Sequence, residues 1–175
     1  MPGNPLLGFL EHARGILLNS SSLNNINNNY FADFTSSAIF LYGGLYNTVR
    51  FNRIQSLGEN AKGIELLNNA NNNVPAPTLA YPTTNNAVFG QVTVPDGSIV
   101  DIYVANTDQE AAESTPFPVA SATVIGGQFQ LTDFPLSPIL RYVTATVTSV
   151  NGTSEFGSYL NDTDGDGITD EREDV

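Results

Sequence analysis

The sequence of 175 residues contains no cysteine and no tryptophan. Because a secreted β domain of this size can fold without disulfides, the absence of cysteine does not fix the compartment. Only six lysines and arginines are present, scattered singly, so the chain has no basic stripe for binding nucleic acid. It also has no apolar run of the roughly 18 residues that a membrane-spanning helix needs. The composition therefore argues against nucleic acid as a partner and against a membrane span.

The first residues, Met1-Pro2-Gly3-Asn4, lack the basic start and apolar core of a signal peptide. The chain is then either cytoplasmic or a fragment of a longer protein. We favour a fragment, because a stack of coils normally carries a capping unit where it opens.

An internal repeat runs through residues 15–66. Ile16 and Ile39 lie 23 positions apart, a second block containing Ile26 keeps the same offset, and Ile64 follows 25 positions after Ile39. Repeats of roughly 20 to 50 residues indicate stacked supersecondary units. Short apolar runs broken by Asn, Ser and Gly favour strands. The pattern predicts a parallel β-helix with one coil per repeat.

Asparagines recur at equivalent positions of the repeat, Asn24 with Asn47 and Asn29 with Asn52. Stacked Asn side chains can hydrogen-bond to the copies above and below, and Asn tolerates the left-handed backbone of a tight corner. An Asn-rich linker would have the same composition, but it would not keep the isoleucines in step. We therefore predict asparagine ladders at the coil corners.

A boundary follows at Val74-Pro75-Ala76-Pro77, since proline cannot donate to a sheet ladder. Beyond it, turn signals separate segments that we expect to be strands: Thr78 to Tyr81, Ala87 to Val94, Ser98 to Asn106, Pro118 to Ile125, Gln128 to Leu131, Leu140 to Val150 and Ser154 to Leu160. Alternating apolar residues predict that each strand buries one face. This favours an immunoglobulin-like sandwich, although its Cys and Trp landmarks are missing.

The chain resembles the carboxyl-terminal part of secreted bacterial right-handed β-helix proteins. The resemblance rests on the Gly-Ile-Glu-Leu of the last repeat, the "VDIYVANTD" strand and, above all, "VTATVTSVNGTSEFGSYL". In that family a similar strand pair closes an immunoglobulin-like module. The resemblance covers about Gly15 to Leu160. Together with the patterns above it implies an all-β chain, with coils of a short right-handed parallel β-helix over residues 1–74 and an immunoglobulin-like β-sandwich over 75–160, followed by an acidic tail over 161–175. It also implies an extracellular or cell-surface location, and some relatives cleave or bind polysaccharides.

The acidic tail carries the strongest chemical signal. From residue 162 to the end, seven acids against one arginine give −6 of the net charge of −12. Acids at loop positions 1, 3, 5, 9 and 12, with Gly at 6, match the oxygen-rich spacing that Ca²⁺ requires. We predict calcium coordination by side chains and by the backbone carbonyl of Ile168, the full set being Asp162, Asp164, Asp166, Ile168, Asp170 and Glu173. A solvated acidic tail is the alternative.

The loop is similar to thrombospondin type 3 repeats and dockerin-like linkers rather than to an EF-hand. A strand is expected before it, and the chain ends two residues after Glu173, which leaves no exit helix. We expect calcium to order the tail, because carboxylates packed this closely repel one another when no cation is bound.

We expect no catalytic residues in this chain. A polysaccharide enzyme needs charged groups that project together from successive coils. The repeat instead places Glu65 beside Phe40, Arg50 beside Asn27 and Arg53 beside Tyr30.

The sequence favours a secreted or cell-surface module, structural or adhesive, that calcium stabilises. Exposed coil ends would allow it to form homo-oligomers or filaments. The alternative is a carbohydrate-binding or polysaccharide-processing β-helix protein whose active coils lie upstream. A surface glycan would then be gripped by exposed aromatic residues, for which the candidates are Tyr30, Phe34, Tyr42, Tyr46 and Phe51.

The calcium prediction can be tested by isothermal titration calorimetry. Extracellular calcium modules bind with dissociation constants of roughly 10⁻⁴ to 10⁻³ M, so millimolar Ca²⁺ should produce binding heat. If millimolar calcium produces no heat, the calcium site is excluded.

Overall fold

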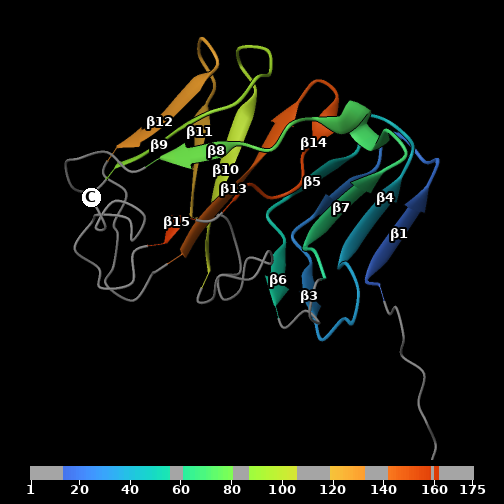
Figure 1. Ribbon diagram of the computed structural model, residues 1–175. Coiled ribbons are helices and arrows are strands. Elements are labelled where there is room, and N and C mark those ends of the chain that lie inside the picture. The colour runs from blue at the N-terminus through green and yellow to red at the C-terminus, as the bar shows by residue number, and fades with distance from the viewer. Residues whose placement is uncertain are drawn as a thin grey trace, which may run out of the picture.

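The computed structural model describes residues 14–55, 61–80, 87–105, 119–132, 142–158 and 160–161. Within these ranges the regular elements are strands, apart from one short 3₁₀ helix, so the chain is all-β. Parallel coils lie on one side of the molecule and an antiparallel sandwich on the other (Figure 1). The described ranges contain no helix with the length and apolar character needed to cross a bilayer.

Three short parallel sheets wind into the coils. They consist of β1 (Ile16–Asn19), β4 (Ile39–Tyr42) and β7 (Ile64–Leu67); β2 (Asn25–Asn27) and β5 (Thr48–Arg50); and β3 (Tyr30–Ala32) and β6 (Arg53–Gln55). Ile16 pairs with Ile39, and Ile39 pairs with Ile64, as the repeat predicts. The result is a stack like a parallel β-helix, with two complete coils and the beginning of a third.

Apolar side chains from all three sheets fill the interior of the coils. The fully or almost fully buried members include Ile26, Phe31, Ile39, Leu41, Val49, Ile54 and Ile64. Because side chains alternate across a strand, each short strand supplies only one or two of them. Stacking of successive coils is therefore what makes this core continuous.

Two asparagine ladders join the coils, as predicted. The backbone N–H of Asn24 donates to Asn47 Oδ1 at 3.0 Å, and that of Asn29 donates to Asn52 Oδ1 at 3.0 Å. The left-handed residues at these corners, however, are not the ladder asparagines but the residues before them, among them Tyr46 with φ of 61°. The ladder asparagine uses its amide for hydrogen bonding while its neighbour turns the chain.

The third coil departs from the first two after β7. After β7 the chain forms a 3₁₀ segment, η1 (Ala70–Asn73), at the point in the sequence where each of the first two coils forms a strand. Its Asn71 is fully buried and extends the first ladder, because Asn71 Oδ1 accepts the backbone N–H of Asn47 at 2.9 Å. The coil then runs into the sandwich.

The sandwich consists of two antiparallel sheets around one apolar core. One sheet has the order β12-β9-β8 and the other β11-β10-β13-β14, with β15 also paired to β13. The strands are β8 (Thr78–Ala80), β9 (Ala87–Gln91), β10 (Ile99–Ala105), β11 (Ala120–Thr123), β12 (Gln128–Thr132), β13 (Tyr142–Ser149), β14 (Gly152–Thr153) and β15 (Leu160–Asn161). Val100, Ile102 and Val104 point into the core, as their alternation predicts.

Two features of the sandwich differ from the sequence-based expectation. The segment predicted to be a strand from Ser154 to Leu160 is not one, since residues 154–158 lie in no strand between β14 and β15. Strands β10 and β13 are also buried on both faces, because Asp101, Thr144 and Thr146 have no exposed surface. Both differences arise because this sheet packs against the coils.

The first ladder can be tested with Asn47→Ala. The side chain of Asn47 is fully buried and bonds to Asn24 and to the carbonyl of Ser21, so its removal leaves the partly buried N–H of Asn24 and the carbonyl of Ser21 without partners. Each such group costs about 1–3 kcal/mol, so the free energy of unfolding should fall by about 2–4 kcal/mol in urea titrations. The control is Asn25→Ala, since Asn25 is an exposed residue of β2; this variant should change the free energy of unfolding by less than about 0.5 kcal/mol. Equal effects would contradict a structural ladder.

Candidate functional site

The chemically richest part of the described structure is the junction between coils and sandwich. Its first element is β14, which lies beside β5 where a third-coil strand would be expected. The N–H of Thr153 donates to the carbonyl of Asn47 at 3.0 Å, and Thr153 Oγ1 accepts the N–H of Val49 at 2.9 Å. A parallel bridge joins Asn47 to Gly152. A hairpin of the sandwich thus continues the β2-β5 sheet of the coils.

Gly152 is required at this contact for steric reasons. Its φ is 116°, and a Cβ atom there would lie 2.4 Å from the side chain of Asn71. The close approach lets Asn71 Nδ2 donate both to the carbonyl of Asn47 at 2.8 Å and to the carbonyl of Thr153 at 2.9 Å. The ladder of the coils therefore ends on the backbone of the sandwich.

Glu155 and Phe156 cover the rest of the coil end. Glu155 Oε1 accepts the N–H of Leu66 on β7 at 2.7 Å, and its other oxygen pairs with Lys62 Nζ at 2.9 Å. The ring of Phe156 packs on Gly63 and against the apolar core of the coils. These two residues occupy positions where a following coil would supply a backbone acceptor and an apolar side chain.

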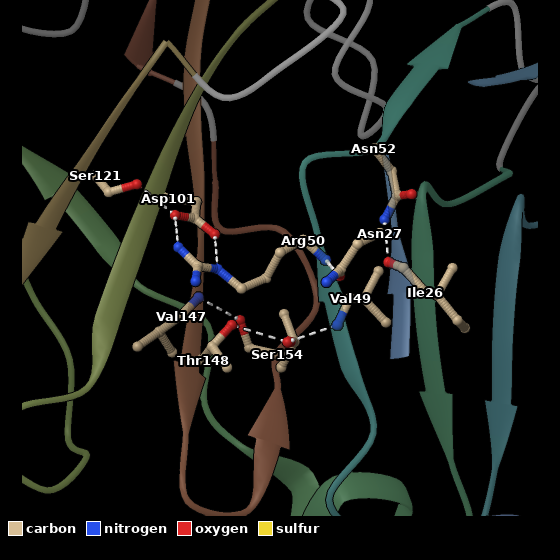
Figure 2. Close-up of polar contacts among 11 residues, drawn as sticks. Ile26, Asn27, Val49, Arg50, Asn52, Asp101, Ser121, Val147, Thr148 and Ser154 are labelled. Carbon is tan, nitrogen blue, oxygen red and sulfur yellow. Dashed lines mark hydrogen bonds and ion pairs between the residues drawn. The ribbon is translucent and has the colours of Figure 1, made fainter. Parts of the chain in front are cut away.

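A buried ion pair crosses the junction farther along β5. Arg50 Nε and Nη2 each donate to the carboxylate of Asp101 at 2.6 Å, and Ser121 Oγ donates to the same carboxylate at 2.6 Å (Figure 2). The Asp101 side chain has no exposed surface, whereas Arg50 is 22% exposed. The hydrogen bonds to Asp101 raise the pKa of Arg50 above its usual value. The bidentate geometry fixes the angle between strand β5 and strand β10.

Tyr103 lies beside this pair on β10. Its ring makes an edge contact with Phe156, with centroids 5.0 Å apart, and the residue is 2% exposed. Burial, followed by the nearby charge of Asp101, raises the pKa of Tyr103 well above its usual value of 10.0. The folded protein therefore keeps the proton of this phenol at a pH where an exposed tyrosine would lose it.

The residues predicted to bind calcium lie outside the described part of the chain. Asp162, Asp164, Asp166, Ile168, Asp170 and Glu173 all belong to residues 162–175, so the structure does not test them. Within the described ranges, no group of three or more His, Asp or Glu side chains is placed to hold a metal ion.

Three of the aromatic residues considered for glycan binding lie at separate positions on the coils. Tyr42 is 43% exposed on β4, and its ring lies 6.5 Å from that of Phe40. Tyr30, 59% exposed, belongs to another sheet, where its hydroxyl donates to Gln55 and Arg53 lies over its ring. Phe34 packs against the coil core. Tyr30, Phe34 and Tyr42 thus have different surroundings, and only Tyr30 and Tyr42 are exposed.

The pairing of charged residues agrees with the sequence-based expectation. Glu65 stands beside Phe40, Arg50 beside Asn27 and Arg53 beside Tyr30 in the observed registers. The charged side chains that stand out are instead those of the junction, Asp101 and Glu155, which the repeat pattern did not single out.

This geometry describes an all-β protein in which a β-helix-like stack ends in a β-sandwich. A comparison with family models agrees, since the model for "Periplasmic copper-binding protein (NosD)", a parallel β-helix family, matches residues 9–75. The match covers the coils and ends at the predicted boundary before the sandwich. A search of curated proteins finds no match.

The neutral Tyr103 predicts a loss of stability at high pH. Above pH 10.0 the tyrosine ionises in the unfolded chain while the folded chain keeps its proton. The unfolded state then binds fewer protons, so the free energy of unfolding should fall by up to about 1.4 kcal/mol per pH unit. Urea titrations of the protein and of Tyr103→Phe between pH 9 and 11 measure this slope. The variant should have the shallower slope, and equal slopes would contradict the assignment.

Proposed function

We propose that this chain is an extracellular or periplasmic structural module in which the sandwich terminates the coil stack and holds it in a fixed orientation. The observation that carries this proposal is the junction, where β14 continues a coil sheet and Phe156 packs on the coil core. Such contacts bury both partners over several strands, unlike a flexible linker between independent domains. An adhesive role would use the same rigid arrangement to present a surface.

The finer fold assignment belongs to the same proposal. We infer an immunoglobulin-like topology because the order β12-β9-β8 opposite β11-β10-β13-β14 corresponds to strands E, B, A and C′, C, F, G of that fold. We infer right-handed coils because parallel crossover connections are right-handed in almost all proteins. We retain the predicted division into residues 1–74, 75–160 and 161–175.

The proposed location rests on the family match. The matched family is described as periplasmic and copper-binding, but the donor set of this chain does not fit copper. Copper sites in proteins favour His, Cys and Met, whereas this chain has no Cys, one His and one Met. The proposal therefore includes a location outside the cytoplasm and does not include copper.

Calcium binding by the acidic tail is a further part of the proposal, supported by the spacing of its carboxylates alone. Bound calcium would order the segment after β15 and extend the rigid structure. We assign no catalytic activity to the chain.

Self-association is restricted by the junction. β14, Glu155 and Phe156 cover part of the coil end that follows β7, so head-to-tail stacking of copies cannot use those positions. A homo-oligomer formed through coil ends would pair at the strands that remain edges among those described, β6 or β1.

Differential scanning calorimetry tests whether the junction makes one structural unit. Coils and sandwich should unfold in a single transition with equal calorimetric and van't Hoff enthalpies. Arg50→Met leaves the buried carboxylate of Asp101 without its cation, which should cost about 3 kcal/mol. For a chain of this size, that loss lowers Tm by roughly 10 °C.

The matched control is Arg53→Met. Arg53 stacks on Tyr30 and forms no ion pair within the described residues, so Tm should change by no more than about 2 °C. Two separate transitions in the unmodified protein would overturn the proposal. Equal effects of the two arginine variants would also overturn it.

A further inference from the structure

A second feature with binding character lies on the sandwich, away from the junction. The β12-β9-β8 sheet forms the side of the sandwich farther from the coils (Figure 1). A hollow of about 550 Å³ lies on it and extends to the end of β11. A volume of this size accommodates a small-molecule ligand or a few sugar units.

Strand register explains how the lining is arranged. Gln128, Gln91 and Thr78 are paired across the three strands, and Ile125 continues this row through its bridge to Gln128. The neighbouring row on the same outer face of the sheet contains Gln130, Phe89 and Ala80. Because side chains two residues apart share a face, these rows lie side by side. Phe89 is half-buried between the exposed residues Gln130 and Ala80.

The chemistry of this lining is neutral. The lining residues include no Asp, Glu, Lys, Arg or His, although the chain as a whole carries a net charge of −12. Gln91, Gln128 and Gln130 form no side-chain hydrogen bond to any residue that the structure describes, and each therefore offers an amide donor and acceptor to a ligand. The asparagines of the coils, in contrast, use their amides within the fold.

We propose that this hollow, named here the glutamine face (Thr78, Phe89, Gln91, Gln128, Gln130 and Ile125), binds an uncharged oligosaccharide. Amides can pair with sugar hydroxyls as both donors and acceptors, and an aromatic ring covers the apolar face of a pyranose. Uronic-acid polymers lack a cationic partner here and are repelled by the net charge.

Affinity electrophoresis of the intact chain tests the site. Native gels would contain galactomannan, xyloglucan, dextran or β-1,3-glucan as neutral probes, and polygalacturonate as the anionic probe. At least one neutral polysaccharide should retard the protein, and polygalacturonate should not. Phe89→Ala and Gln130→Ala should each raise the dissociation constant at least about tenfold, which corresponds to about 1.4 kcal/mol.

Tyr42→Ala is the matched control, since Tyr42 is an exposed aromatic residue outside the glutamine face and its loss should leave retardation unchanged. Gln130 is exposed, so its replacement by Ala should leave Tm unchanged. A loss of binding in this variant therefore reports on the site and not on folding. The proposal is overturned if none of the neutral polysaccharides retards the protein, if polygalacturonate retards it equally, or if Tyr42→Ala weakens binding as much as Gln130→Ala. The calorimetric result for the junction is independent of all these outcomes.

Discussion

A stack of parallel coils has to end, and its last coil exposes both backbone hydrogen-bonding groups and an apolar cross-section. In this protein the groups at that end include the N–H of Leu66, which donates to Glu155, and the N–H of Val49, which donates to Thr153 Oγ1. A buried polar group left without a partner costs about 1–3 kcal/mol, so an uncovered end would lose much of the stability that stacking provides. The segment from Gly152 to Phe156 supplies the missing partners, and the position of the sandwich follows from that requirement.

The same constraint explains the unusual character of the sheet that faces the coils. Strand β10 buries Val100 and Ile102 in the sandwich core and Asp101 on the opposite side. A carboxylate in such a position requires a cation and further donors, which Arg50 and Ser121 provide. Arg50 is itself fixed on β5, since its backbone N–H bonds to Asn27 Oδ1 in the neighbouring coil. The ion pair thus connects strand β5 of the coils to strand β10 of the sandwich.

The sequence was sufficient to predict the features that depend on local or repeated patterns. The stacking of Ile16, Ile39 and Ile64 follows from the repeat, and so do the two asparagine pairs. The third ladder member, Asn71, was not predicted because its offset from Asn47 is 24 rather than 23. Partners such as Arg50 and Asp101 are 51 residues apart in different modules, and no periodicity connects them.

The segment after β14 shows the limit of pattern-based prediction. Alternation of polar and apolar residues from Ser154 onward favours a strand, yet Glu155 and Phe156 both contact the coils. In a regular strand adjacent side chains would point to opposite faces, so the chain must leave the sheet for both to reach the coils. The contacts that draw this segment out of the sheet are made with the coils, so the sequence of the segment alone does not predict its conformation.

The first ladder connects the coils to the sandwich. Asn24 donates its backbone N–H to Asn47, Asn47 donates its own to Asn71, and Asn71 donates its amide to the carbonyl of Thr153. Asn47 and Asn71 also donate their side-chain amides to carbonyls of the preceding coil, those of Ser21 and Asn47. The corner at Asn47 is therefore bonded to the coils on both of its sides, and the last corner is bonded to the sandwich. The sandwich thus provides the last hydrogen-bond partner of the ladder.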